Sequence, residues 1–256
     1  MDQKIKTTAK AGYIAKGVVY ALTGALSLSA AFGSGGQNAG KLQVIEFLEK
    51  QAFGKVILAL LGLGLVCYAI WRFMQSIQDP EGIGSDTKAI IKRISFFISG
   101  VVYLGLGIFA IVEIFKQNTG GSGGSSFLTG DMRKYAFIAV GAALAIKGVY
   151  QFIKAYKGDF LKKFNIKSIS SEKRRKSIKT FGYSGLVSRG IVVCIIAYIL
   201  LKTGMSGGSG EAKGTSEALS MLQQNTSPWI FGIIAAGLIG YGLYMFAMAK
   251  YRSFDD

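Results

Sequence analysis

Long apolar segments alternate with short polar connections along the whole chain. Each of six such segments is long enough to cross a bilayer core of about 30 Å, which takes roughly 20 helical residues. Stretches such as Val56–Ile70 have no polar face at helical spacing, and this argues against a soluble helical bundle. We therefore predict six transmembrane helices, at Ala11–Phe32, Phe53–Met74, Ile94–Phe115, Tyr135–Ile153, Gly182–Leu201 and Trp229–Ala249.

The apolar segments form three copies of one two-helix unit. A Gly-Val-Val-Tyr or similar motif opens each unit, a Ser-Gly-Gly connection follows, and an aromatic motif ending in Phe closes it. The opening motifs are Gly17–Tyr20, Gly100–Tyr103 and Gly190–Val193, and the connections contain Ser34–Gly36, Ser122–Gly124 and Ser206–Gly208. The closing motifs are Ala69–Phe73, Gly148–Phe152 and Gly242–Phe246. Repetition at a fixed period defines the architecture. We expect an all-α integral membrane domain over residues 1–256, with three parallel two-helix repeats related by pseudo-threefold symmetry. The repeats span 10–75, 93–154 and 181–248, and a basic loop, 154–180, precedes the third.

The connections inside the repeats differ in length. Apolar residues recur at helical spacing in Lys41–Gln51 and again in Glu217–Leu222, so we expect a short helix in the first and third connections. The middle connection is four residues shorter, and we expect it to lack this helix.

The charge is distributed unevenly between the two sets of loops. The chain has 30 basic and 14 acidic residues. The termini, the loops between repeats and the adjoining span ends hold a surplus of +14, whereas the connections inside the repeats and their span ends hold +2. By the positive-inside rule, both termini are expected to be cytoplasmic in a bacterial inner membrane.

The basic loop is the densest cationic stretch. Its two interpretations are that it only fixes topology, or that it binds anionic lipid headgroups or a membrane protein partner. Phe160, Leu161, Phe164 and Ile166 interleave with its cations, so part of it is expected to lie as a helix on the anionic leaflet. No recognition motif accompanies the charge, which argues against a nucleic-acid partner.

Composition excludes several kinds of chemistry. The chain has no histidine and two cysteines, Cys67 and Cys194, on different repeats. Histidine-ligated haem, His-based metal sites and Ser-His catalysis are thereby excluded. No acidic residue lies near the middle of a predicted span, so a carboxylate proton relay is absent. We expect no catalytic residue, no cofactor and no metal site, and hence a protein that is not an enzyme.

Glycine makes up 35 of the 256 residues, and its positions match between repeats. Small residues on one helix face let helix backbones approach closely in a membrane. We therefore predict helix-packing roles for seven glycines: Gly17, Gly24, Gly100, Gly107, Gly190, Gly232 and Gly240.

Three cations within or beside the spans are candidates for a polar or lipid site. Lys147 lies about 9 Å inside the cytoplasmic end of its span, at the position that Tyr68 and Tyr241 occupy in the other repeats. It either extends to the interface or lines a central polar space that would bind an anion or a headgroup. Lys16 and Arg189 occupy matching positions at the starts of their spans and are interpreted as topology anchors.

The tandem pattern also resembles a known family. The residues that carry the resemblance are the opening motifs at Lys16–Tyr20 and Arg189-Gly190, the Ser-Gly-Gly connections, Ser216–Leu219, and the glycines of Gly62–Leu65 and Gly237–Gly242. They are similar to the bacterial membrane family called domain of unknown function 1206, whose members have three two-helix repeats. The middle copy departs from the pattern, with Ser99 at the basic position and a shorter connection. The resemblance implies the fold and the topology, and it brings no activity and no catalytic residues.

Two functional classes follow from these observations. The first is a structural, accessory or scaffold protein of the membrane. The second is a channel or carrier for a small ion or solute along the pseudo-threefold axis. No span carries an internal proline of the kind that breaks transporter helices, and this favours the first class.

Overall fold

The computed structural model describes residues 3–33, 41–115, 130–164, 169, 171–206 and 215–252. Helices account for nearly all of them, and the extended pairing within these ranges is a single bridge between Phe164 and Arg252. The elements are α1 (Gln3–Ala31), α2 (Lys41–Glu49), α3 (Gly54–Ile77), α4 (Thr87–Phe115), α5 (Gly130–Lys157), the 3₁₀ turn η1 (Asp159–Lys163), α6 (Glu172–Met205), α7 (Thr215–Asn225) and α8 (Pro228–Tyr251).

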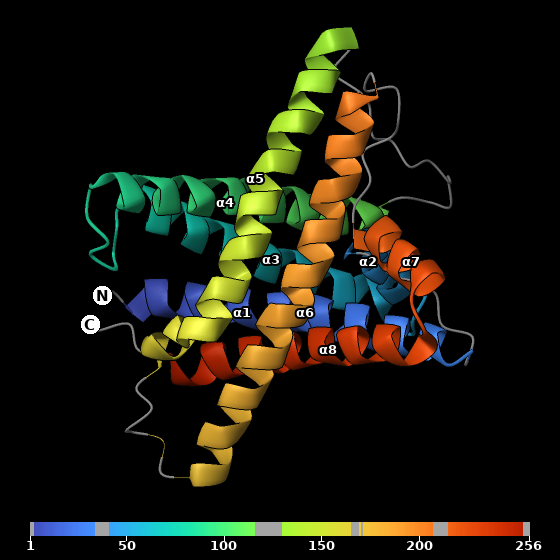
Figure 1. The fold of residues 1–256 in the computed structure, drawn as a ribbon. Helices are drawn as coiled ribbons and strands as arrows, with labels where there is room; N and C mark the ends of the chain where they lie inside the picture. Colours follow the sequence, from blue (N-terminus) through green and yellow to red (C-terminus); the bar gives the residue numbers. More distant parts are fainter. Residues whose placement is uncertain are drawn as a thin grey trace.

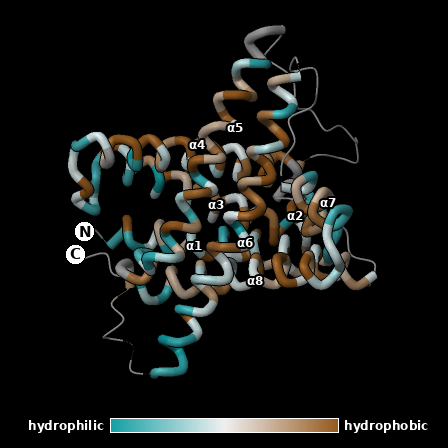
Figure 2. The backbone as a smooth tube through the Cα atoms, viewed as in Figure 1, coloured by the Kyte–Doolittle hydropathy of each residue, from teal (hydrophilic) through white to brown (hydrophobic). Residues whose placement is uncertain are grey.

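Six of these helices are long and apolar enough to span a membrane, namely α1, α3, α4, α5, α6 and α8. The prediction of an all-helical membrane protein with six spans is confirmed. The first helix of each repeat begins earlier than its predicted span, by 8, 7 and 10 residues for α1, α4 and α6. The start of α6 is hydrophilic, whereas the middles of the long helices are hydrophobic (Figure 2).

The two ends of the bundle differ in what they carry. Both chain termini lie at one end, called here the terminal end, and α2 and α7 lie at the other, called the distal end (Figure 1). The predicted short helices in the first and third connections are present as α2 and α7. Val44 and Ile45 of α2 and Leu219 of α7 are fully buried, so both helices cap the bundle. The prediction for the middle connection lies outside the described residues.

The three repeats contact one another through three equivalent interfaces. The second helix of each repeat packs along the first helix of the next, in the pairs α3 with α4, α5 with α6, and α8 with α1. In each pair the closing phenylalanine lies against the opening glycine. A Cβ added at Gly17 would come within 2.6 Å of Phe246, one at Gly100 within 2.7 Å of Phe73, and one at Gly190 within 3.0 Å of Phe152. The pseudo-threefold relation is therefore visible in the contacts between repeats.

The other glycines expected to pack helices also lie at helix contacts. An added Cβ would meet Ala235 from Gly24, Val66 from Gly107, Phe32 from Gly232 and Ser184 from Gly240. Because these neighbours lie on other helices or segments, each glycine lets two parts of the bundle come closer than an alanine would allow.

Inside the repeats, by contrast, only two of the three hairpins are closed. A Cβ at Gly12 would lie 2.5 Å from the Cα atom of Tyr68, and one at Gly185 would lie 2.5 Å from that of Tyr241. These glycines let α1 cross α3, and α6 cross α8, at backbone contact. The matching residue of the middle repeat is Ser95, which already carries a Cβ. Among the described residues α4 and α5 make at most marginal contact, and α5 runs with α6 steeply across α4 (Figure 1).

The open middle hairpin leaves apolar residues uncovered. Val19 of α1 and Val192 of α6 are 1% and 3% exposed, whereas the matching Val102 of α4 is 47% exposed. Ile98 is likewise half exposed, at a position where the other repeats have buried Ala15 and Ser188. The middle repeat therefore presents to the membrane a face that the other two repeats bury.

The start of the basic loop is folded against the protein. Phe160 is fully buried and makes edge contacts with Tyr183 and Tyr244, and Phe164 packs on the same Tyr244. Gly182 makes room for Phe160, since an added Cβ would come within 2.2 Å of the ring. The expectation that these apolar side chains lie on the lipid leaflet is therefore wrong for both phenylalanines. Burial in the helix bundle removes more of their surface from water than the interface would. Ile166 lies outside the described residues.

Candidate functional site

Lys16 lies inside the helix bundle, where four tyrosine rings surround it. Its side chain is 2% exposed, and its ammonium group donates a hydrogen bond of 2.8 Å to the Tyr68 hydroxyl. The same group lies 4.7 to 5.9 Å from the ring centroids of Tyr20, Tyr68, Tyr103 and Tyr241. Cations at such distances are attracted to the ring faces, most strongly where water is excluded. The interpretation of Lys16 as a surface anchor is therefore wrong.

Arg189 approaches the same rings from α6. Its guanidinium group donates to the Tyr20 hydroxyl at 3.0 Å and to the Tyr241 hydroxyl at 2.9 Å. The guanidinium carbon also lies 5.4 and 4.9 Å from the centroids of those two rings. Two hydrogen bonds to groups inside the bundle show that Arg189, like Lys16, is not a surface anchor.

Arg72 is the third cation at this place. Its guanidinium group donates twice to the Tyr68 hydroxyl and once, at 2.8 Å, to the side-chain oxygen of Gln75. It also lies over the ring of Phe96 on α4, 4.9 Å from the centroid. Tyr68 thus accepts hydrogen bonds from two cations, Lys16 and Arg72.

We call this set of side chains the tyrosine–cation cluster, and it contains three cations and no acid. Its seven members come from α1, α3, α4, α6 and α8; they are Lys16, Tyr20, Tyr68, Arg72, Tyr103, Arg189 and Tyr241. The rings themselves touch, with centroids 4.7 Å apart both for Tyr20 with Tyr241 and for Tyr68 with Tyr103. The cluster therefore fills the space between the helices.

The cluster lies deep in the bundle. Tyr68 is nine residues before the end of α3, and Tyr241 is ten residues before the end of α8. At 1.5 Å per residue these distances are about 14 and 15 Å from the terminal end. These two tyrosines, which accept hydrogen bonds from the cations, therefore lie more than two helical turns below that end of the bundle.

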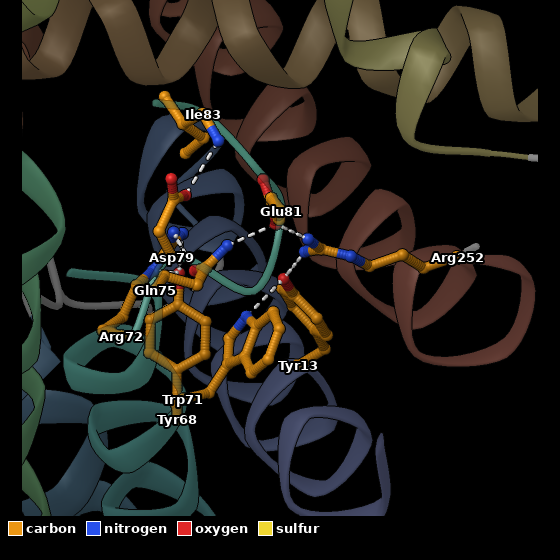
Figure 3. A network of polar contacts seen from close by, with 9 residues as sticks. All are labelled: Tyr13, Tyr68, Trp71, Arg72, Gln75, Asp79, Glu81, Ile83 and Arg252. Atoms are coloured by element: carbon orange, nitrogen blue, oxygen red, sulfur yellow. Dashed lines mark hydrogen bonds and ion pairs between the residues drawn. The ribbon is translucent and has the colours of Figure 1, made fainter. Parts of the chain in front are cut away.

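A polar network connects the cluster with the terminal end (Figure 3). Gln75, which accepts from Arg72, donates to the carboxylate of Glu81 in the α3–α4 connection. Glu81 forms an ion pair with Arg252, just after α8, and Arg252 also donates to the hydroxyl of Tyr13. These contacts join α1, α3, α8 and the connection into one unit.

The α3–α4 connection is itself held in a fixed shape by Asp79. This residue has a positive φ of 45°, and its carboxylate accepts hydrogen bonds from the backbone N–H groups of Ile83 and Gly84 at 2.8 Å each. The two backbone hydrogen bonds lower the pKa of the Asp79 carboxyl group, and the charges of Arg93 and Lys92 act in the same direction.

The structure brings together two of the three cations singled out in the sequence. Lys16 and Arg189 are both in the cluster, whereas Lys147 is half-buried on α5, in the open hairpin. Arg72 and the four tyrosines were not among the candidate residues. Matched repeat positions were the signal that could have found most of them, because Lys16 matches Arg189, Tyr20 matches Tyr103, and Tyr68 matches Tyr241.

Metal sites and cavities are the other places where a ligand could bind. Within the described residues no three His, Cys, Asp or Glu side chains gather in a way that would hold a metal ion. A cavity of about 600 Å³ lies at the distal end between α6 and α7, lined by polar side chains such as Lys202, Thr203, Ser216, Glu217 and Gln224. Its lining residue nearest to Arg189 along α6 is Tyr198, nine residues or about 14 Å away, so the cavity is separate from the cluster.

Comparison with known proteins identifies the family. The family profile described as Domain of Unknown Function (DUF1206) matches residues 11–79 and 184–252. The chain belongs to this family. It is also 31% identical to the uncharacterized protein YxxB of Bacillus subtilis strain 168, over 97% of this chain and 91% of that protein. No solved structure matches the chain.

The two matched regions of this DUF1206 protein are its first and third repeats. These are also the two repeats whose hairpins are closed, and they supply six of the seven cluster residues. The middle repeat supplies Tyr103 alone. Its departure from the family pattern and its open hairpin therefore occur together.

Proposed function

We propose that this protein is a non-enzymatic membrane protein that binds an anionic group at the tyrosine–cation cluster. The observation that carries the proposal is the excess of positive charge in the cluster. A guanidinium group has five N–H donors and no acceptor, and Arg189 directs two of its donors to Tyr20 and Tyr241. The cluster holds three cations and no acidic member, and the tyrosines that accept their hydrogen bonds bring no negative charge. A bound anion supplies the negative charge that such a set lacks.

The depth of the cluster adds weight to this proposal. Insertion of Lys or Arg at the centre of a membrane helix costs about 3 kcal/mol each on translocon scales. Ring faces and phenol oxygens offset part of this cost for three cations, but they neutralise no charge. Cations kept at such a depth mark a functional site by default.

The contacts between the rings favour binding over an open channel. Tyr20 and Tyr241, and likewise Tyr68 and Tyr103, are in edge contact and fill the axis at this level. We therefore place the protein in the accessory or scaffold class, with an anion as its ligand. A carrier, in which the rings move apart to pass the anion, is the second candidate, and it is supported by the position of the cations between helices of all three repeats.

Thermal unfolding in detergent with inorganic phosphate as the probe tests the proposal. We expect phosphate to raise the Tm at constant ionic strength, and Arg189→Gln to weaken the apparent affinity at least tenfold, because a bidentate cation is lost. Arg93→Gln is the matched control, since Arg93 donates to the backbone oxygens of Ser76 and Ile77, outside the cluster. A phosphate effect that Arg189→Gln leaves unchanged, or no effect in the native protein, would overturn the proposal.

For the orientation we propose that the terminal end faces the cytoplasm of a bacterial inner membrane, as the charge distribution indicates. Ser85 is exposed in the α3–α4 connection and Gln224 is exposed at the distal end. In a background without Cys67 and Cys194, an impermeant thiol reagent should label Gln224→Cys, but not Ser85→Cys, in spheroplasts. The reverse labelling would contradict the orientation. The basic loop would then lie on the cytoplasmic side, where we propose that it contacts anionic headgroups or a membrane protein partner.

A further inference from the structure

We infer that the open side of the middle repeat admits an anionic lipid, with its headgroup at the tyrosine–cation cluster and an acyl chain between α4 and α5. This inference rests on the proposed function and names the ligand of the same site. It draws on three features of the middle repeat: the residues that keep its hairpin open, the apolar face left uncovered, and the polar side chains beside that face.

The hairpin is open because its residues are too large for the crossing that the other repeats make. The closed hairpins rest on two contacts each, one of which is Gly64 against Ala15 in the first repeat and Gly237 against Ser188 in the third. A Cβ at either glycine would come within 2.7 Å of the facing Cβ atom. The middle repeat has Ala143 and Ile98 at these positions, and Ser95 at the other contact. The three side chains together prevent the backbones of α4 and α5 from meeting.

The uncovered face is apolar and borders the cluster. Val102 and Ile98 are exposed on α4, and Val140, which matches buried Leu61 and Ile234, is exposed on α5. Val102 directly precedes Tyr103, whose ring contacts Tyr68 and Lys16 in the cluster. Because successive helical residues point in different directions, the apolar surface suited to an acyl chain lies beside, on the same turn of α4, the ring that contacts the cations.

Two polar side chains of α5 add to this complementarity. Lys147 adds a fourth cation at the position that the cluster tyrosines Tyr68 and Tyr241 occupy in the other repeats. Gln151, one turn further, matches Arg72 of the first repeat and is only 4% exposed. Its amide nitrogen and oxygen find no hydrogen-bond partner among the described residues, and a buried amide without partners is destabilising. A headgroup with donor and acceptor oxygens supplies what the Gln151 amide lacks, and its negative charge complements the cation of Lys147.

An anionic lipid fits these features better than a soluble anion or a neutral lipid. A soluble anion leaves the apolar face uncovered, and a zwitterionic headgroup brings its own cation to a site that already has several. Basic sites between transmembrane helices on the cytoplasmic side are a known mode of acidic-lipid binding. The ligand is therefore expected to be a phospholipid with a net negative headgroup, such as phosphatidylglycerol.

Fluorescence quenching by brominated lipids tests where the acyl chain lies. A tryptophan introduced as Val102→Trp, in protein reconstituted into nanodiscs, reports bromines within contact distance. We expect brominated phosphatidylglycerol to quench the added fluorescence at least threefold more efficiently than brominated phosphatidylcholine at equal mole fraction. Equal quenching by the two lipids would mean ordinary lipid contact, and no quenching by either would mean that protein, such as a second copy of the chain, covers the face. Either result overturns the inference.

A repacked hairpin provides the second test. The triple variant Ser95→Gly, Ile98→Ala, Ala143→Gly gives the middle repeat the contact residues of the first, and we expect it to close α4 on α5. The preference for phosphatidylglycerol should then be lost. The control pair Ile108→Ala and Ile146→Ala changes exposed apolar residues of the same helices and should keep the preference. An unchanged preference in the triple variant would overturn the inference.

The phosphate titration separates the two proposals. If phosphate raises the Tm through Arg189 while the lipid preference is absent, the proposed function stands and the lipid inference fails. If phosphate has no Arg189-dependent effect, the proposed function fails first.

Should the triple variant fail to fold, Gln151→Leu replaces it. That variant is expected to raise the Tm of the delipidated protein, because it removes an unpaired buried amide, and to reduce the preference for phosphatidylglycerol at least twofold. An unchanged preference in Gln151→Leu overturns the inference in the same way.

Discussion

The first and middle repeats of this protein contain the same kinds of helix, yet one hairpin is closed and the other is open. Both repeats pack equally well against their neighbours, since Gly17 and Gly100 meet the closing phenylalanines Phe246 and Phe73 in the same way. They differ where each hairpin crosses itself, with Gly12 in one and Ser95 in the other. In a membrane, close backbone contact rather than apolar burial holds helices together. A few methyl or hydroxymethyl groups therefore decide whether a hairpin closes.

The largest difference in stability between the two hairpins is expected when Gly12 is replaced. Gly12→Leu places a side chain on the backbone of Tyr68, where a Cβ alone would be 2.5 Å from Cα. We expect a loss of at least about 3 kcal/mol, the upper range for overpacking a core, seen as a large fall in Tm in detergent. Ser95→Leu, the matched change in the open hairpin, should lower the Tm little. Equal falls for the two variants would show that the middle hairpin is closed in the membrane.

A comparable loss of stability is expected when glycines at the interfaces between repeats are replaced, and here the middle repeat should behave like the first. Gly17→Leu and Gly100→Leu each insert a side chain against a phenylalanine ring, at 2.6 and 2.7 Å from the added Cβ. We expect about 2 kcal/mol of destabilisation for each, and clearly less for the neighbouring Val18→Leu and Val101→Leu. If Gly100→Leu were tolerated and Gly17→Leu were not, the three interfaces would not be equivalent.

A smaller effect is expected at the position shared by Tyr68 and Lys147. Tyr68→Phe removes the hydroxyl that accepts from Lys16 and Arg72, leaving buried donors unsatisfied at a cost of about 1 to 3 kcal/mol. Lys147→Leu is expected to change the Tm by no more than a degree or two, because its helix does not pack on α4. Circular dichroism during heating measures both. A larger loss for Lys147→Leu than for Tyr68→Phe would place Lys147 in the cluster.

The smallest effect concerns the connection between the first two repeats. The carboxylate of Asp79 has a lowered pKa in the folded protein, so its hydrogen bonds stabilise the fold at pH values above its ordinary pKa of about 3.9. This stabilisation is lost as the pH falls through the lowered value. Asp79→Asn should therefore unfold at a slightly lower temperature than the native protein at pH 7, and the difference should shrink in acid. A difference that grows in acid would contradict the assignment of these hydrogen bonds.

The sequence was sufficient to predict six spanning helices and the helices α2 and α7, because hydrophobic length and helical spacing act locally. It also drew attention to Lys16 and Arg189. Their interpretation as anchors was wrong because each was judged by its distance from the nearest membrane surface. A helix position alone does not reveal the direction of a side chain, and Lys16 faces Tyr68, 52 residues away.

Other features depended on comparing small residues across helices. The open hairpin follows from Ser95, Ile98 and Ala143, and none of them is unusual in a single membrane helix. Their effect is visible only once the partners Gly12, with Tyr68, and Ala15, with Gly64, are known to touch in the first repeat. The burial of Phe160 could not be predicted for the same reason, because the space it occupies is created by Gly182.

The cyclic order of the interfaces has a consequence for how the chain is connected. The contact between α8 and α1 is equivalent to those between α3 and α4 and between α5 and α6, although no peptide segment links α8 to α1. Both termini lie at the same end of the bundle (Figure 1). A circular permutant that joins the termini through a short linker and begins in the α3–α4 connection, near Ser85, should therefore assemble the same domain. In such a ring of repeats, the contacts between neighbouring helices are expected to determine the fold, whichever repeat comes first along the chain.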